Sequence, residues 1–178
     1  PAMQRLQGKG LVRYEAVCDL NRNLAENYAA ELKVKRVFTH MEEMIEQCDL
    51  DGLDLITTPE IKRTPLEIAI ESQIPFLVEK PPTLTSAVHK RHLENIGDLP
   101  HVVGYNRRHS PLLVQARDWI KNETLQAAFV SFSRFQRWDQ DFTTTAVHPI
   151  DTIRYLVGKD FTKLNIEAVP SGKACNYF

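Results

Sequence analysis

Short apolar runs alternate with helix-like segments over residues 13–122, and this alternation is the strongest constraint on the fold. The strand-like runs are "RYEAVCD", "RVF", "LDLITT", "PFLVE" and "HVVG". Between them, apolar residues recur at helical spacing, as Leu24, Tyr28 and Leu32 do on one predicted helix face. Strands and helices joined by short connections predict βαβ units, and therefore an α/β fold with a parallel sheet covered on both faces.

Capping residues mark where the predicted helices begin and end. Thr39 and Glu42 predict a capping box for a helix that runs through Cys48. Thr64 is the predicted N-cap of the next helix, with Pro65 at its first position. Gly97 predicts the end of "TSAVHKRHLENI", and Ser110 followed by Pro111 predicts the start of "PLLVQARDWIKN".

The pattern changes after about residue 122. The run "LQAAFVSFSRFQRW" alternates small or polar with apolar residues, which predicts an antiparallel strand with one buried face. A polar loop, "DQDFTTT", precedes a predicted helix, "VHPIDTIRYLVG", and a further strand, "KLNIEAV". We therefore predict a domain boundary near Lys121, with one domain in residues 1–121 and the start of a second in residues 122–178.

Composition excludes several classes of function. With 178 residues, of which 43% are hydrophobic, the chain can bury a core in one or two globular units. A net charge of -1 argues against nucleic-acid and membrane-surface partners. Cys18, Cys48 and Cys175 form no metal-ligand pattern, so we expect no metal site and a reduced, cytoplasmic setting. The N-terminal residues are too polar for a signal peptide, and no apolar run approaches the roughly 18 residues that span a bilayer.

Chemically versatile residues follow the predicted strands directly. Since the carboxyl ends of parallel strands meet at one edge of a sheet, we expect a ligand crevice there, although strand-end loops are polar in many proteins. The residues concerned are Asp19, Thr57, Thr58, Pro59, Glu79, Lys80, Gly104, Tyr105 and Asn106.

Five motifs then resemble a known family. "VCDLN", "TTPEIKRTPLEIAI", "VEKPPTLT", "VGYNRRHSP" and "HPIDTIRYLVG" occur in the order and spacing of the glucose-fructose oxidoreductase/inositol dehydrogenase/MocA family. The resemblance implies a Rossmann domain that binds NAD or NADP, followed by an α/β domain with a large open, mainly antiparallel sheet. It also implies a sugar, a polyol or a related small hydroxy compound as substrate, and a homo-oligomer.

The resemblance assigns cofactor contacts to the residues that follow the strands. Asp19 would accept hydrogen bonds from the adenosine ribose hydroxyls, which favours NAD, while the nearby Arg22 leaves NADP open. On the sequence alone, Asp19 is equally a turn or N-cap residue. The other expected cofactor contacts are Thr57, Thr58, Pro59, Glu79, Lys80 and Asn106.

The resemblance also implies the catalytic roles. Lys80 would bind the substrate oxygen and stabilise its developing negative charge, with Pro81 aiming it through a Lys–Pro bond that is often cis in the family. His148 would be the general acid/base, since its ordinary pKa lies near neutrality. Asp151 would contact substrate or act as a charge at a helix N-terminus. Without the resemblance, Lys80 is a solvated lysine and His148 a capping or packing residue.

Two departures from the family pattern keep an alternative open. Thr144 stands where the family often has an aspartate, four residues before His148. No Gly-x-Gly-x-x-Gly turn occurs, and "GKG" at residues 8–10 follows a helix-like segment, so we expect that the turn and first strand lie upstream. The resemblance thus implies an NAD(P)-dependent dehydrogenase or, as the alternative, a non-catalytic, nucleotide-sensing or regulatory relative. A sugar-phosphate-binding domain without redox chemistry would need phosphate-cradling glycines that the sequence lacks.

Overall fold

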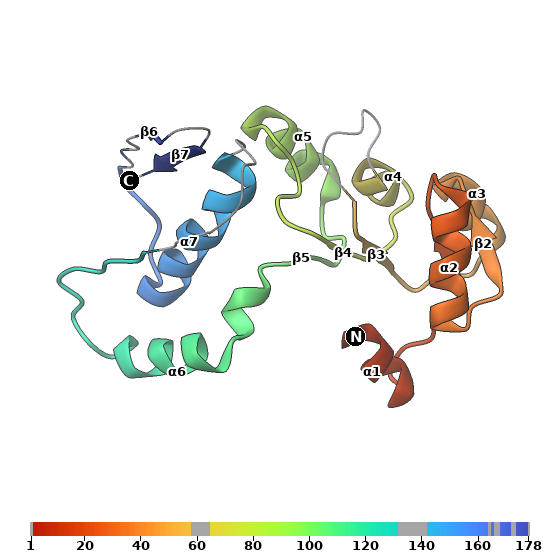
Figure 1. Ribbon diagram of the computed structural model, residues 1–178, viewed down its shortest axis with the longest axis horizontal. Coiled ribbons are helices and arrows are strands. Elements are labelled where there is room, and N and C mark those ends of the chain that lie inside the picture. Colours follow the sequence, from red (N-terminus) through yellow and green to blue (C-terminus); the bar gives the residue numbers. More distant parts are fainter. Residues whose placement is uncertain are drawn as a thin grey trace. The chain divides into compact units, whose positions relative to one another are not determined.

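The computed structural model describes residues 2–57, 65–131, 142–163, 165, 168–171 and 174–177. Within these ranges, short strands alternate with helices as the sequence predicts (Figure 1). The chain packs as two compact units, the first made of residues 1–78 and 87–102 and the second of residues 79–86 and 103–178. None of the helices in the described ranges combines the length and apolarity that a bilayer crossing requires.

The strands of the first unit form two small parallel sheets. β1 pairs in parallel with β2, with Val17 opposite Val37, and β3 pairs in parallel with β4, with Asp54 opposite Leu77. β5 adds to the second sheet beside β4, which gives the order β3-β4-β5. The elements are α1 (Ala2–Gly8), β1 (Ala16–Cys18), α2 (Arg22–Leu32), β2 (Arg36–Phe38), α3 (Met41–Gln47), β3 (Leu53–Leu55), α4 (Pro65–Glu71), β4 (Phe76–Val78), α5 (Ser86–Ile96) and β5 (His101–Val103).

Burial alternates along β3 and β4. The first and third residues of β3 and β4 are buried, whereas the middle residues, Asp54 and Leu77, are exposed. Four residues of α4 are also buried and add to the core: Leu66, Ile68, Ala69 and Ile70. The predicted burial of both sheet faces therefore does not hold for β3 and β4, because only one face is covered in the described part of the chain.

The buried face of α2 differs from the predicted one. Leu24 and Tyr28 are 46% and 53% exposed, whereas Ala25 and Ala29 are 0% and 3% exposed. α2 packs on β1 and β2, and a methyl side chain lets the helix backbone approach those strands closely. The prediction from Leu24, Tyr28 and Leu32 was wrong because close approach, rather than side-chain size, decides which face is buried.

The helix ends largely agree with the sequence. α4 begins at Pro65, α5 ends before Gly97 with its φ of +53°, and α6 begins at Pro111 after Ser110. The predicted N-cap Thr64 lies outside the described residues. α3 begins one residue later than predicted: its N-cap is His40, which makes no side-chain capping bond. Glu42 then occupies the second helical position, one short of the position that a capping box needs.

The second unit contains η1 (Asn106–His109), α6 (Pro111–Ile120), α7 (Phe142–Val157), β6 (Ala168–Ser171) and β7 (Ala174–Tyr177). β6 and β7 pair antiparallel. The predicted strand "KLNIEAV" overlaps β6 only at its last two residues. Of the predicted strand 125–138, residues 125–131 form no strand, and the remainder lies outside the described residues. A larger antiparallel sheet stays a prediction.

α7 is longer than the sequence indicates. It begins at Phe142 and takes in the three threonines that the sequence assigns to a loop, and it ends before Gly158, whose φ is +70°. Threonine disfavours a helix only weakly, and tertiary context overrides such a preference. His148 therefore lies inside the helix and not at its start.

Candidate active site

The structure divides the predicted site residues between the two units. Asp19 and Thr57 belong to the first unit, and Thr58 and Pro59 lie outside the described residues. The remaining predicted residues all belong to the second unit: Glu79, Lys80, Asn106, His148 and Asp151.

Asp19 lies at the carboxyl end of β1, as predicted for a residue that contacts a cofactor. Its backbone N–H donates to the Phe38 carbonyl at 3.2 Å, which extends the β1–β2 pairing. Its Oδ1 accepts from the Asn21 N–H at 2.7 Å, and Asn21 in turn caps α2. Asp19 thus stabilises the turn into α2, the alternative that the sequence left open. This contact occupies Oδ1, so the cofactor role stays a prediction.

Thr57 is exposed two residues after β3, again at the carboxyl end of a parallel strand. The predicted cofactor contact of Thr57 stays a prediction. Arg22, which leaves NADP open, donates from Nε to Glu26 Oε1 at 2.9 Å within α2.

Lys80 follows β4 by two residues, and the peptide bond between Lys80 and Pro81 is cis, as the family resemblance implies. The Lys80 side chain is half-buried, whereas that of Glu79 is exposed. The Lys80 ammonium acts electrostatically on His148 of α7. Lys80 and His148, which are far apart in sequence, therefore belong to one electrostatic environment within the second unit.

His148 is half-buried on α7 and surrounded by more positive than negative charge. Burial lowers the pKa of His148, and the nearby cations Lys80 and Arg107 lower it further, while the Asp151 carboxylate opposes them. Each influence has a simple cause, because burial and neighbouring cations both disfavour an imidazolium. His148 is thus neutral at neutral pH and has a ring nitrogen that can accept a proton.

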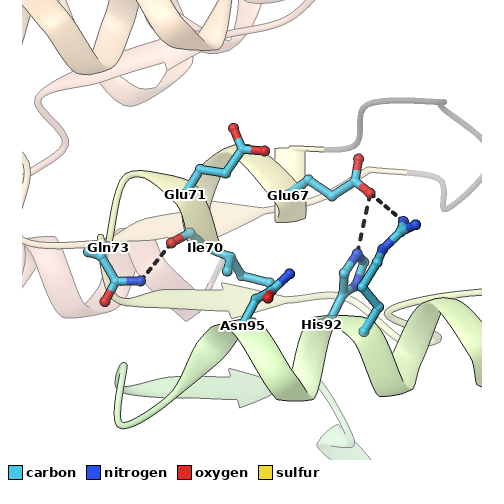
Figure 2. A pocket seen from close by; sticks show the side chains of 7 residues that line it. Glu67, Ile70, Glu71, Gln73, His92 and Asn95 are labelled. Atoms are coloured by element: carbon cyan, nitrogen blue, oxygen red, sulfur yellow. Dashed lines mark hydrogen bonds and ion pairs between the residues drawn. The ribbon is translucent and has the colours of Figure 1, made fainter.

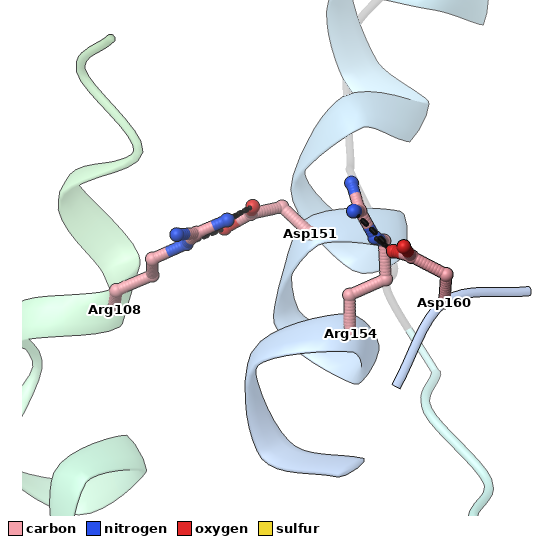
Figure 3. A network of polar contacts seen from close by, with 4 residues as sticks. All are labelled: Arg108, Asp151, Arg154 and Asp160. Atoms are coloured by element: carbon pink, nitrogen blue, oxygen red, sulfur yellow. Dashed lines mark hydrogen bonds and ion pairs between the residues drawn. The ribbon is translucent and has the colours of Figure 1, made fainter. Parts of the chain in front are cut away.

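Asp151, one turn further along α7, is 5% exposed and bound by Arg108 of η1 (Figure 3). Arg108 Nε donates to Asp151 Oδ1 at 3.0 Å and to Oδ2 at 2.9 Å, and Nη2 donates to Oδ1 as well. Asp151 lies far inside α7, so the proposed role at a helix N-terminus is wrong. Contact with substrate stays a prediction.

Sequence reasoning missed the arginines of η1. Both lie in the motif "VGYNRRHSP", and a pair of basic residues directly after a strand was the available signal. Arg108 also lies over the rings of Tyr105 and Tyr155, with its guanidinium carbon 5.2 and 6.0 Å from the ring centres. Asn106, which opens η1, is exposed, and its predicted cofactor contact stays a prediction.

A hollow on the first unit contains none of the predicted site residues (Figure 2). Glu67 of α4 crosses to α5, where Glu67 Oε1 lies 3.1 Å from Arg91 Nη2 and 3.4 Å from His92 Nε2. The remaining lining residues are Ile70, Glu71, Gln73 and Asn95. Because its charges pair with one another between adjacent helices, we interpret this hollow as a polar contact between α4 and α5. Among the described residues, no group of three His, Cys, Asp or Glu could hold a metal ion.

Comparisons with known proteins agree with the motifs. The chain is 29% identical over 174 residues to inositol 2-dehydrogenase 4 of Saccharopolyspora erythraea. The aligned region covers 92% of this chain and 51% of that protein. The chain thus spans about half the length of this relative. No family model matches the chain.

Solved structures share the fold at lower identity. An oxidoreductase from Agrobacterium radiobacter, in complex with NAD+, L-tartaric acid and magnesium, matches with a TM-score of 0.77 and 17% identity, covering 90% of this chain and 52% of that one. Myo-inositol dehydrogenase from Lactobacillus casei, in complex with NAD(H) and myo-inositol, matches with a TM-score of 0.69 and 17% identity, covering 88% and 48%. The chain therefore has a Rossmann-like α/β fold, and these similarities agree with the family resemblance drawn from the sequence.

Proposed function

We propose that this chain is part of an NAD(P)-dependent oxidoreductase that transfers a hydride between a nicotinamide cofactor and a sugar, a polyol or a related hydroxy compound. The observation that carries the proposal is the electrostatic environment of His148. A neutral imidazole, kept neutral partly by Lys80, gives the second unit a proton acceptor and a cation in one place. Oxidation of an alcohol requires a proton acceptor, and a cation beside the hydroxyl oxygen stabilises its developing negative charge.

The division of labour follows from these charges. A bound nicotinamide would supply the hydride acceptor. Lys80 would bind the substrate hydroxyl oxygen and stabilise its negative charge as the proton leaves. His148 would take that proton on a ring nitrogen, and the depressed pKa of His148 keeps this nitrogen unprotonated beforehand.

The cofactor assignment completes the proposal. Asp19 would bind the ribose hydroxyls and favour NAD, with Thr57, Thr58, Pro59, Glu79 and Asn106 as further contacts. Residues 1–121 would belong to the dinucleotide-binding domain and residues 122–178 to the start of the substrate domain. We further propose that the protein forms a homo-oligomer. We also propose a cytoplasmic location, and the free thiols of Cys18 and Cys48 are consistent with a reducing compartment.

The test is substitution of the two reacting groups in the full-length protein. Lys80→Met should lower kcat on the order of 10²–10³-fold, as loss of other donors to a developing oxyanion does. His148→Asn should lower kcat by roughly 10²–10⁴-fold. NADH affinity, measured by fluorescence titration, should stay nearly unchanged in both. Lys121→Met and His89→Asn are matched controls, since both residues are exposed and lie outside the proposed site.

A second function, nucleotide sensing without catalysis, is favoured by Thr144 in place of the aspartate that the family often has. It predicts that the unmodified protein binds NADH but reduces NAD with no sugar or polyol. Near-normal turnover by Lys80→Met would also refute the catalytic proposal.

A further inference from the structure

Two adjacent arginines of η1 interact with two residues of α7 that lie one helical turn apart. The charge of Arg107 acts on His148, and the guanidinium of Arg108 binds the Asp151 carboxylate. Residues three positions apart on a helix are neighbours on its surface, so His148 and Asp151 share one side of α7. η1 and α7 are in contact, and Figure 3 shows Arg108 reaching across to Asp151.

The contact between Arg108 and Asp151 has a defined geometry. A carboxylate that is 5% exposed needs a partner, since burial of an unpaired charge is costly. Arg108 Nε lies 3.0 and 2.9 Å from the two Asp151 oxygens, so the plane of the guanidinium is fixed relative to the carboxylate. Tyr105 and Tyr155 lie against the same guanidinium and restrict it further.

Asp151 acts on His148 directly, and Arg108 acts on Asp151. Asp151 is the negative charge that faces His148 among the described residues, and Arg108 neutralises it. The other charged groups that face His148 are Lys80, in the segment after β4, and Arg107 on η1. Tyr105 also faces Asp151. Burial is the main cause of the raised pKa of Tyr105, and the negative charge of Asp151 raises it further.

We propose that Arg108 is a positioning residue for the reaction: by holding Asp151 it fixes η1 against α7 and balances the negative charge beside His148. The inference rests on the proposed function, in which His148 accepts the proton. A catalytic base needs both a fixed position and a fixed charge environment, and one ion pair supplies both here. Arg108 itself acts through Asp151.

Opposite shifts in the titration of His148 distinguish this role from a merely structural one. Arg108→Met leaves the Asp151 carboxylate unbalanced, so the NMR titration midpoint of the His148 imidazole should move to higher pH. Asp151→Asn leaves Arg108 unbalanced, so the midpoint should move to lower pH. The double variant Arg108→Met/Asp151→Leu removes both charges and should return the midpoint toward its unmodified value. Because an apolar pair can replace a buried ion pair, the double variant guards against failure to fold.

Turnover supplies the second measurement, in the full-length protein. Arg108→Lys keeps the positive charge but loses the bidentate contact with the Asp151 carboxylate. It should therefore leave the His148 titration midpoint nearly unchanged and still lower kcat, by up to roughly 10²-fold. Arg154→Met is the matched control, because Arg154 of α7 binds Asp160 in a similar way (Figure 3). The Arg154 and Asp160 side chains are, however, 47% and 79% exposed. Arg154→Met should change neither quantity.

The outcomes separate the two proposals. If Arg108→Met and Asp151→Asn move the His148 midpoint in the same direction, or leave it in place while the melting temperature falls, the inference about Arg108 is wrong. If the midpoints move as expected but the unmodified protein oxidises no hydroxy compound, the charge balance stands and the proposed function fails. Unchanged kcat in Arg108→Lys would overturn the positioning role.

Discussion

The packing of α2 gives a direct test of which helix face is buried. Ala25 is 0% exposed where α2 contacts β1 and β2, so Ala25→Leu places three additional carbon atoms in a filled site. Overpacking of this kind costs about 1–3 kcal/mol, whereas alanine and leucine differ little in helix propensity. Tyr28 is 53% exposed, so Tyr28→Ala loses less than half of the burial of an aromatic side chain and gains helix propensity. We expect it to cost at most about 1 kcal/mol.

Urea denaturation, followed by circular dichroism, compares the two variants in the full-length protein. The midpoint should fall clearly for Ala25→Leu and little for Tyr28→Ala, with an unchanged slope in both. Leu24→Ala, at a 46% exposed position, should behave like Tyr28→Ala. The packing described for α2 is refuted if Tyr28→Ala and Leu24→Ala are strongly destabilising while Ala25→Leu is neutral, since the face predicted from large apolar residues would then be the buried one.

Two further substitutions test single residues. Lys33 ends α2 with a φ of +59°, a left-handed conformation that costs a side chain roughly 1–2 kcal/mol, so Lys33→Gly should raise stability by about 1 kcal/mol in the same denaturation assay. Lys35→Gly, outside any such conformation, should not raise it. Asp19→Ser should narrow or reverse a preference for NAD over NADP, because the carboxylate would repel a 2′-phosphate. Equal kcat/KM for both cofactors in the unmodified enzyme would contradict that role of Asp19.

Local signals predicted the order and type of elements well. A strand needs only a period of two, and a helix end needs only a capping residue or a glycine with positive φ, so β3, β4, α5 and the end of α7 could be read from adjacent residues. Pairing partners are not local. The alternating residues 125–131 have the composition of a strand, but Phe129 is 97% exposed and no partner strand lies beside this segment in the described ranges. Periodicity predicted a strand there because it carries no information about pairing.

The candidate site shows that ion pairs between distant residues are equally hard to predict from local sequence. Lys80 and His148 were predicted as site residues because family motifs mark them. The ion pair of Arg108 with Asp151, in contrast, joins residues that are 43 positions apart, and no single motif connects them. A physical rule could have indicated it. Asp151 stands among apolar residues in "HPIDTIRYLVG", in a helix that needs a buried face, and a carboxylate on that face requires a cation. The segment "NRRH", which follows the predicted strand "HVVG", contains two. The sequence alone does not distinguish Arg107 from Arg108. Only the structure shows that the charge of Arg107 acts on His148 and that Arg108 forms the ion pair with Asp151.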